Sequence, residues 1–248
     1  MYNLGLIGKN ISHSFSKEYF EKKFKENNIT NFSYSLFPLK TLNQINHFIK
    51  NEKIVGLNVT SPYKEDIIKH LDKLGPIASI TKSVNTIFIT PKYKKMGFNT
   101  DLFGFKSILE KLNTKNKKAL ILGSGGVSKT ISYCLDLENI KHLIVSRYPK
   151  NKMQHYSDIK DVINDYKLII NTTPLGQFPK INNAPNIPYD LITNKHYCID
   201  LIYNPSKTLF LKKAKTKGAQ IINGKEMLIK QAEKSWTLWL KLMTKYNV

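Results

Sequence analysis

The chain has 248 residues, of which 41% are hydrophobic and 23% charged, so it can bury a substantial core in one large or two modest domains. Its two cysteines, Cys134 and Cys198, have neither disulfide-framework nor zinc-site spacing, and we expect no metal; without a signal peptide or a bilayer-spanning apolar run, we expect a cytoplasmic protein. The net charge of +21 could indicate a nucleic-acid or membrane partner, but Arg147 is the single arginine and the lysines are dispersed, which favours a solvated surface and no such partner.

In the first half of the chain, apolar runs alternate with amphipathic segments. The patterns predict strands over residues 2–7, 32–37 and 54–59, helices over 16–27, 41–50 and 62–71, and a hairpin made of 86–89 and 95–98. A further helix should follow Asn99-Thr100-Asp101 and reach about Leu112. The polar stretch 113–117 that follows lies near a boundary between the two halves.

The second half alternates more regularly. It predicts strands over 118–122, 142–145, 168–171, 197–201 and 220–222, and helices over 126–137, 158–163, 206–216 and 226–243, with a loop over 178–188. Strands that alternate with helices imply parallel sheets with right-handed crossovers, which makes this an α/β protein. A (β/α)₈ barrel would share the alternation, but not a glycine-rich turn in mid-chain.

That turn consists of Gly123, Ser124, Gly125 and Gly126. It follows a predicted strand and opens a helix, where glycines let backbone N–H groups approach a pyrophosphate at the positive helix end. The match to G-x-G-x-x-G is imperfect, because Ser128 occupies the third glycine position. An ordinary strand–helix turn is the alternative.

The next predicted strand ends at Ser146 and Arg147. NAD enzymes usually place an acidic residue here for the ribose 2′-hydroxyl, and this chain has none. A guanidinium binds a phosphate in bidentate fashion, so its position favours NADP as the cofactor. A surface arginine without a ligand is the alternative.

Polar side chains also gather where the predicted strands of the first half end, in residues 12–16, 58–64, 84–86 and 99–101. Ligands of open α/β sheets bind beyond the carboxyl ends of the strands. Hydroxyls, amides, one lysine and one carboxylate would suit a polyhydroxylated acid, although each segment alone could be a helix cap or a turn.

The order of motifs HSxS, NVTxPxK, VNT, NTD, GxGG, NTTPLG, DxxYNPxxT and NGxxMLxxQ resembles the shikimate dehydrogenase family from Gly5 to about Trp239. The resemblance implies an N-terminal α/β substrate-binding and catalytic domain, residues 1–100, and a Rossmann-like NADP-binding domain, residues 101–225. The C-terminal helix, residues 226–248, would return to complete the first domain.

The resemblance also implies roles for matching residues. Lys64 and Asp101 would be the catalytic pair. The substrate would be bound by Ser14, Ser16, Asn58, Thr60, Asn85, Tyr203 and Gln231. The cofactor would be bound by Gly123, Ser124, Gly125, Gly126, Val127, Ser146, Arg147, Thr172, Leu201 and Gly224.

The chain departs from the family pattern at several positions, which concern the cofactor more than the chemistry. Lys17 replaces a proline and Ser83 an alanine, Ser146-Arg147-Tyr148 replaces Asn-Arg-Thr, and Val127 and Thr130 are bulkier than usual.

The expected function is the reversible NADPH-dependent reduction of 3-dehydroshikimate to shikimate, in the chorismate pathway to aromatic amino acids, by a monomer or homodimer. The alternatives are a quinate/shikimate dehydrogenase that uses NAD and a non-catalytic homologue that binds a metabolite or nucleotide.

Overall fold

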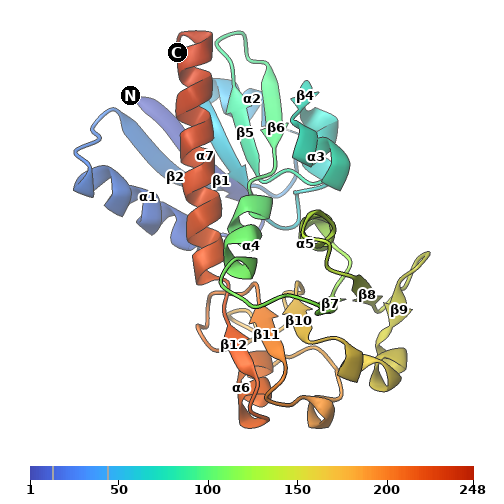
Figure 1. Cartoon of the computed structure of the whole chain (residues 1–248). Helices are drawn as coiled ribbons and strands as arrows, with labels where there is room; N and C mark the ends of the chain where they lie inside the picture. The colour runs from blue at the N-terminus through green and yellow to red at the C-terminus, as the bar shows by residue number, and fades with distance from the viewer. Residues whose placement is uncertain (13, 44) are drawn as a thin grey trace. The chain divides into compact units, whose positions relative to one another are not determined.

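The computed structural model describes the whole chain except residues 13 and 44, and it divides into two compact units (Figure 1). The first unit comprises residues 1–100 and 231–248, and the second comprises residues 101–230. One long helix, α7 (Lys225–Tyr246), begins in the second unit and continues into the first.

The first unit is built on a six-stranded sheet in the order β2-β1-β3-β5-β6-β4. Its strands are β1 (Tyr2–Gly8), β2 (Phe32–Pro38), β3 (Ile54–Val59), β4 (Lys73–Leu74), β5 (Thr86–Ile89) and β6 (Lys95–Phe98). Its other helices are α1 (Phe15–Glu26), α2 (Ile45–Asn51), the 3₁₀ helix η1 (Asp66–His70) and α3 (Pro76–Thr81). The sheet is mixed, because β5 runs antiparallel to both β3 and β6, whereas β1 is parallel to β2 and β3.

Alternate side chains of this sheet enter two separate cores. One core joins Leu57 and Ile87 of the strands to Ile45 and Ile49 of α2 and Ile67 of η1. The opposite core is rich in aromatic residues and joins the strands to α1 and α7 through Leu4, Phe20, Phe24, Phe88, Trp236 and Trp239. Successive side chains along a strand point to opposite faces of the sheet, so the same strands contribute to both cores.

The seating of α7 on β3 and β5 requires a glycine. A Cβ atom added to Gly56 would lie 2.7 Å from Trp239 Nε1, and this indole nitrogen donates to the Ile87 carbonyl at 2.9 Å. Trp239 is fully buried. The absence of a side chain at Gly56 lets the helix approach closely enough for that hydrogen bond.

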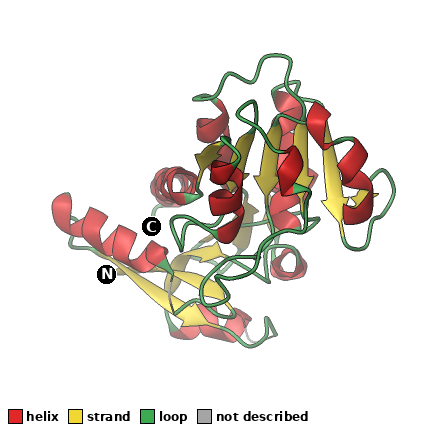
Figure 2. Ribbon diagram, turned by 90° about the horizontal axis from the view of Figure 1, so that it is seen from below, coloured by secondary structure: helices red, strands yellow, loops and turns green. Residues whose placement is uncertain are grey.

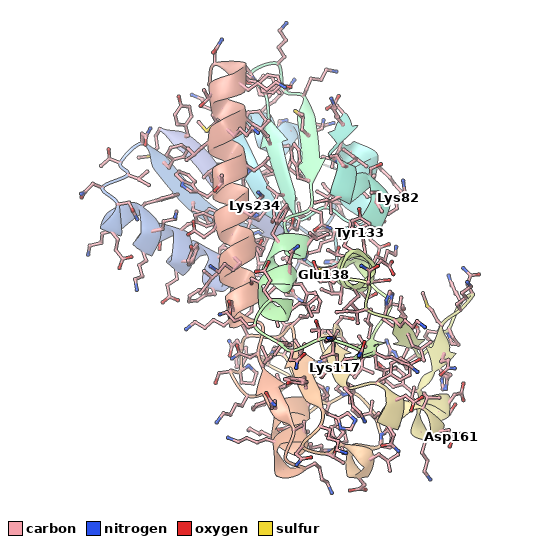
Figure 3. The ribbon with its side chains drawn as sticks, viewed as in Figure 1. Lys82, Lys117, Tyr133, Glu138, Asp161 and Lys234 are labelled. Atoms are coloured by element: carbon pink, nitrogen blue, oxygen red, sulfur yellow. The ribbon has the colours of Figure 1, made fainter. Side chains whose placement is uncertain are left out.

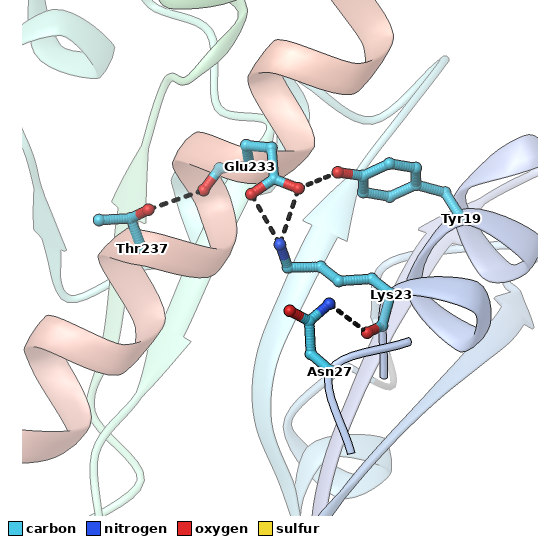
Figure 4. Close-up of polar contacts among 5 residues, drawn as sticks. All are labelled: Tyr19, Lys23, Asn27, Glu233 and Thr237. Atoms are coloured by element: carbon cyan, nitrogen blue, oxygen red, sulfur yellow. Dashed lines mark hydrogen bonds and ion pairs between the residues drawn. The ribbon is translucent and has the colours of Figure 1, made fainter. Parts of the chain in front are cut away.

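Polar contacts join α1 to α7 at the edge of the aromatic core (Figure 4). Glu233 accepts hydrogen bonds from the Tyr19 hydroxyl and from Lys23 Nζ, the latter at 2.8 Å. Burial, with the neighbouring Glu233 carboxylate adding to it, raises the pKa of Tyr19, so this phenol remains a donor. Together with the packing of Phe20 and Phe24, these contacts fix α1 against α7.

The second unit contains a fully parallel six-stranded sheet in the order β12-β11-β10-β7-β8-β9. Its strands are β7 (Ala119–Leu122), β8 (His142–Ser146), β9 (Gln154–His155), β10 (Leu168–Asn171), β11 (Tyr197–Asp200) and β12 (Gln220–Ile222). Its helices are α4 (Asp101–Leu109), α5 (Gly126–Leu137), α6 (Leu209–Thr216) and the 3₁₀ helices η2 (Tyr156–Asp161), η3 (Ile163–Asp165) and η4 (Tyr189–Leu191).

Strands β7 and β10 are buried at every residue, which requires cover on both faces of the sheet, and Figure 2 shows helices on both sides of it. The strand order is that of a doubly wound dinucleotide-binding fold. Its direction of winding reverses between β7 and β10, where such folds bind ligands.

The predicted α/β architecture and most of its elements are confirmed, including the hairpin of β5 and β6. Two predicted helices are wrong in type: residues 62–71 form a turn followed by η1, and residues 158–163 lie in η2 and the start of η3. In the first case Tyr63 N donates to Thr60 and Ile68 N to Glu65, which are three-residue spacings. The sequence did not predict α3, and the mixed first sheet departs from the parallel expectation. Helix α2 begins at Ile45 instead of residue 41, and residue 44 lies outside the described part.

Most lysines of both units are exposed, among them Lys82 and Lys234 (Figure 3), as expected for a solvated cationic surface. Among the helices that the structure describes, none combines the length and the apolar character needed to cross a membrane. Within the same residues there is no group of three or more histidine, cysteine or carboxylate side chains that could hold a metal ion.

Candidate active site

In the first unit, polar side chains converge where β3, β5 and β6 meet α7. Asn58, near the end of β3, lies directly opposite Thr86 of β5. Its Nδ2 donates to the Asn85 carbonyl at 3.2 Å and to Ser235 Oγ at 3.0 Å, and its Oδ1 accepts from the Tyr34 hydroxyl at 2.9 Å. A buried side chain with this many partners has a defined orientation.

Asn85 is the second amide of this group and is also buried. Its Oδ1 accepts from the Thr100 main-chain N–H at 2.7 Å, while its Nδ2 donates to Thr100 Oγ1 at 2.9 Å and to Gln231 Oε1 at 3.1 Å. The network therefore brings together three of the predicted substrate-binding residues, Asn58, Asn85 and Gln231.

The predicted serines join the same network through a tyrosine. Ser14 caps α1, and its Oγ accepts from the Ser16 N–H at 3.3 Å. Ser16 also hydrogen-bonds to Tyr34, whose pKa is raised by burial and lowered to a smaller extent by that bond. Tyr34 keeps its proton and donates it to Asn58, so it connects α1 to β3. Residue 13, the histidine of the HSxS motif, lies outside the described residues.

Lys64 and Thr60 lie in the turn that follows β3, and both are half-buried. The turn is tied to the sheet by hydrogen bonds from the Thr60 N–H to the Ile7 carbonyl at 2.9 Å and from the Val84 N–H to the Lys64 carbonyl at 2.8 Å. The main chain of Lys64 is therefore held next to Val84, and the start of its turn is held to β1.

Asp101 opens α4 as the first residue of the second unit and is 4% exposed. In the chain it follows Thr100, which belongs to the first unit's network. Tyr203, the remaining predicted substrate residue, is half-buried and lies in the second unit, in the loop after β11.

The glycine-rich turn connects β7 to α5 in the second unit. Gly123 has a φ of 114°, and a Cβ atom there would lie 2.7 Å from Thr172 Oγ1, so both its conformation and its surroundings demand glycine. Gly125 is the N-cap of the 12-residue α5, where no side chain caps the helix and a Cβ would meet no described atom within 4 Å. The N–H groups at this helix end are thus accessible to an anion.

Two serines join this turn to the end of β8. Ser124 Oγ lies 3.0 Å from Ser146 Oγ, which accepts from the Tyr148 N–H at 3.2 Å. Arg147, which lies between Ser146 and Tyr148 in the chain, is exposed and lies near Tyr156. Burial raises the pKa of Tyr156 to about 12, against an opposing effect of the arginine charge. Arg147 thus follows directly after β8, at the end of the strand that the sequence predicted.

Three further predicted cofactor residues line the ends of neighbouring strands. Thr172 Oγ1 donates to the Leu122 carbonyl at 2.8 Å, which ties the loop after β10 to β7. Gly224 follows β12, and a Cβ atom there would lie 2.0 Å from the Leu201 carbonyl oxygen. This contact explains why glycine precedes α7.

A buried carboxylate that sequence reasoning left without a role supports these loops. Asp200, at the end of β11, accepts hydrogen bonds from Asn171 Nδ2 at 3.0 Å, from the Ile202 N–H at 3.1 Å and from Thr208 Oγ1. Asn171 Oδ1 in turn accepts from Thr173 Oγ1 at 2.7 Å. Desolvation by burial raises the pKa of Asp200 to about 6, although all three hydrogen bonds oppose the rise.

Sequence reasoning also missed three hydroxyls of the first unit. Thr86 and Thr100 stand in the VNT and NTD motifs but were given no role, and Ser235 was overlooked. All three contact one another at the centre of the network. The available signal was the spacing of Gln231 and Ser235, which lie four residues apart and therefore on one face of the helix.

Comparison with known proteins identifies the family. Residues 6–87 match the model described as the shikimate dehydrogenase substrate binding domain. A relative from Clostridium botulinum named shikimate dehydrogenase (NADP(+)) is 41% identical, and the alignment covers 96% of each chain.

Solved structures agree with this assignment. The crystal structure of shikimate dehydrogenase 1 from Peptoclostridium difficile is 32% identical with a TM-score of 0.89, over 97% of this chain and 92% of that one. A shikimate 5-dehydrogenase from Thermus thermophilus, in complex with NADP(H) and shikimate, is 26% identical with a TM-score of 0.83, over 96% and 93% of the two chains. The chain therefore belongs to the shikimate dehydrogenase family.

Proposed function

We propose that this chain catalyses the reversible NADPH-dependent reduction of 3-dehydroshikimate to shikimate, a step of chorismate and aromatic amino acid biosynthesis. The observation that carries the proposal is the buried network of Asn58, Asn85 and Gln231, which belongs to the unit that contains the matched substrate-binding domain. Amides and hydroxyls fixed in this way suit a ligand that carries several hydroxyl groups.

The residues of the second unit fit NADP. Gly123 lets the turn pack against Thr172, Gly125 leaves room for a pyrophosphate, and the uncapped start of α5 offers N–H groups. Ser146 and Arg147, at the end of β8, would bind the 2′-phosphate. Ser124, Gly126 and Val127 would complete the phosphate turn, with Thr172, Leu201 and Gly224 toward the nicotinamide. When bound, the cofactor supplies or accepts the hydride.

The residues of the chain supply binding and proton transfer. Ser14 and Ser16 would bind the substrate carboxylate, and Asn58, Thr60, Asn85, Tyr203 and Gln231 would orient the ring. In the direction of reduction, Lys64 would donate a proton to the carbonyl oxygen at C3 while that carbon gains a hydride. In oxidation Lys64 would take the proton back, and Asp101 would serve as its partner in the catalytic pair.

The test is absorbance in the NADPH range at neutral to mildly alkaline pH, with shikimate or quinate offered against NADP or NAD. Turnover of shikimate with NADP is the expected result. Turnover with quinate or NAD would retain the catalytic residues but assign a broader specificity. A folded sample without turnover for any pair would overturn the proposal in favour of a non-catalytic homologue.

A further inference from the structure

Three buried hydroxyls form a closed ring inside the first unit. Ser235 Oγ on α7 lies 2.7 Å from Thr86 Oγ1 of β5 and 3.1 Å from Thr100 Oγ1, and the two threonine oxygens are 3.2 Å apart. None of the three residues is more than 2% exposed. The ring therefore joins a helix, a strand and the segment after β6 without contact with bulk solvent.

The amides around the ring restrict how its protons are placed. Asn58 Nδ2 lies 3.0 Å from Ser235 Oγ, and Asn85 Nδ2 lies 2.9 Å from Thr100 Oγ1. An amide nitrogen can only donate, so the hydroxyls accept at these contacts. Their own protons then go to one another or to nearby acceptors, which include the main-chain carbonyl of Gln231, 3.0 Å from Ser235 Oγ.

Further contacts orient the two amides. Asn58 Oδ1 accepts from the Tyr34 hydroxyl, which lies outside the ring, so the Asn58 nitrogen faces the ring. Asn85 Oδ1 accepts from the Thr100 main-chain N–H and lies 3.2 Å from both Thr86 Oγ1 and Thr100 Oγ1, so both ends of this amide contact ring residues. Asn85 also donates to Gln231 Oε1 at 3.1 Å. The ring hydroxyls are thus the shared partners that keep Asn58 and Asn85 in one arrangement and, through Asn85, hold Gln231.

We propose that Ser235 is a positioning residue of the substrate site, whose hydroxyl closes this ring and so fixes the carboxamides of Asn58, Asn85 and Gln231 for the substrate. The inference rests on the proposed function, in which those three residues contact the substrate. Ser235 itself acts only through them.

Packing, and not the ring, sets the place of Ser235. Trp239, one helical turn further along α7, is fixed by the Ile87 carbonyl and by the close approach to Gly56, and Asn58 follows Gly56 on the same face of β3. Removal of the hydroxyl should therefore leave the helix seated and disturb only the polar network.

The kinetic test is Ser235→Ala in the full chain. We expect KM for shikimate to rise about 5- to 10-fold, because the loss of one hydrogen bond weakens binding by about that factor. We expect kcat to stay within about 2-fold of the wild-type value and KM for NADP to stay unchanged. Thr86→Val, which removes a ring hydroxyl at constant volume, should act in the same direction, and Thr86→Ser, which keeps the hydroxyl, should restore binding.

Thr237→Ala is the matched control, because Thr237 makes the same hydroxyl contact to the carbonyl four residues earlier, 3.0 Å to Glu233, but on the exposed face of α7 (Figure 4). It should leave both KM values at the wild-type level. A rise in KM for shikimate as large in Thr237→Ala as in Ser235→Ala would overturn the proposal, because it would show a general effect on the helix.

A second measurement does not depend on turnover. Side-chain amide correlations in ¹⁵N NMR spectra should shift for Asn58 and Asn85 in Ser235→Ala, while those of Asn27, which bonds to the Lys23 carbonyl on α1, stay in place. Unchanged Asn58 and Asn85 signals would refute the positioning role. If the wild type turns over no shikimate, the proposed function fails, and the amide signals still decide what Ser235 does.

Discussion

The two units stabilise the polar ends of their strands by different chemistry. In the first unit the buried network consists of neutral amides and hydroxyls, with Ser235 and Asn58 at its centre. In the second unit the network is organised by a carboxylate, Asp200, which is fully buried.

The difference matters because a neutral network has no protonation state to change, whereas the carboxylate gains stronger hydrogen bonds at the cost of titrating. In the proposed function each unit also contributes one cation, Lys64 in the first and Arg147 in the second. The proposed function thus assigns positioning to the network and chemistry or recognition to the cation, and variants at each of these residues test that assignment.

The largest expected effect is that of Lys64→Ala. Loss of a proton-transfer group should lower kcat by about 10² to 10⁴ while KM changes only a few-fold. Steady-state kinetics measures both constants. Lys69→Ala, at a lysine whose side chain is 80% exposed, is the control and should behave as the wild type. A kcat near the wild-type value would remove Lys64 from the chemistry.

Next in size is Asp200→Ala, which leaves the Asn171 amide, the Ile202 N–H and the Thr208 hydroxyl without their acceptor. Buried donors left unpaired should lower the free energy of unfolding by about 3 kcal/mol in urea denaturation. Asp190→Ala, at a fully exposed carboxylate paired with Lys217, should have no measurable effect. Equal losses in both variants would show that the Asp200 network contributes nothing.

Arg147→Ala separates recognition from positioning. Loss of charge-assisted bonds to a 2′-phosphate should raise KM for NADP about 10- to 100-fold and leave KM for NAD little changed. Arg147→Lys, which keeps the charge but not the planar fork, should fall between the two. If both cofactors lose affinity equally, Arg147 does not read the 2′-phosphate.

The pH dependence of stability sharpens the contrast between the networks. The folded chain holds the Asp200 proton more tightly than the unfolded chain, with a pKa of about 6 against an ordinary 3.8, so the wild type gains stability as pH falls from about 6 toward 4. Asp200→Asn lacks this gain. Between pH 7.5 and pH 5, the wild type should gain about 1 kcal/mol in unfolding free energy relative to Asp200→Asn.

The groups around Asp200 do not obscure this measurement. Tyr189 and Cys198 lie close to it, and burial raises the pKa of each, so both remain neutral throughout the pH range. The pKa of His196 is lowered by burial, which makes its protonation destabilising in acid, but the wild type and the variant share it. A difference that stays constant with pH would contradict the raised pKa of Asp200.

The smallest effect tests the first unit's neutral interior. Ser83 is fully buried, and among the described residues none hydrogen-bonds to its Oγ. Ser83→Ala should therefore raise the free energy of unfolding by about 1 kcal/mol in urea denaturation. A loss of stability would show that this hydroxyl is satisfied in solution.

Much of the fold was predictable because its signals are local. The limits of β3, β5, β6, β10 and α5 agree with the apolar periodicity and turn residues. The prediction of an α-helix over residues 62–71 was wrong. Pro62 and the spacing of Ile67 and Leu71 suit a helix, but main-chain hydrogen bonds to the carbonyls of Thr60 and Glu65 close tighter turns.

The candidate site was less accessible to sequence reasoning, because its networks depend on packing between distant segments. Ser235 reaches Asn58 only since Gly56 admits Trp239 close to the sheet. Asp200 supports the loop after β10 through Asn171, a contact across neighbouring strands. Motifs identified positions in the chain but could not show which of them touch one another.

The passage of α7 from the second unit into the first has a consequence for synthesis on the ribosome. The second unit, residues 101–230, is contiguous and complete once residue 230 has been made, whereas the first unit still lacks residues 231–248 at that point. Trp236 and Trp239, which fill the aromatic core of the first unit, are among these late residues. Domains generally fold as units during translation, so the first unit can complete its aromatic core only after the whole of the second unit has been made.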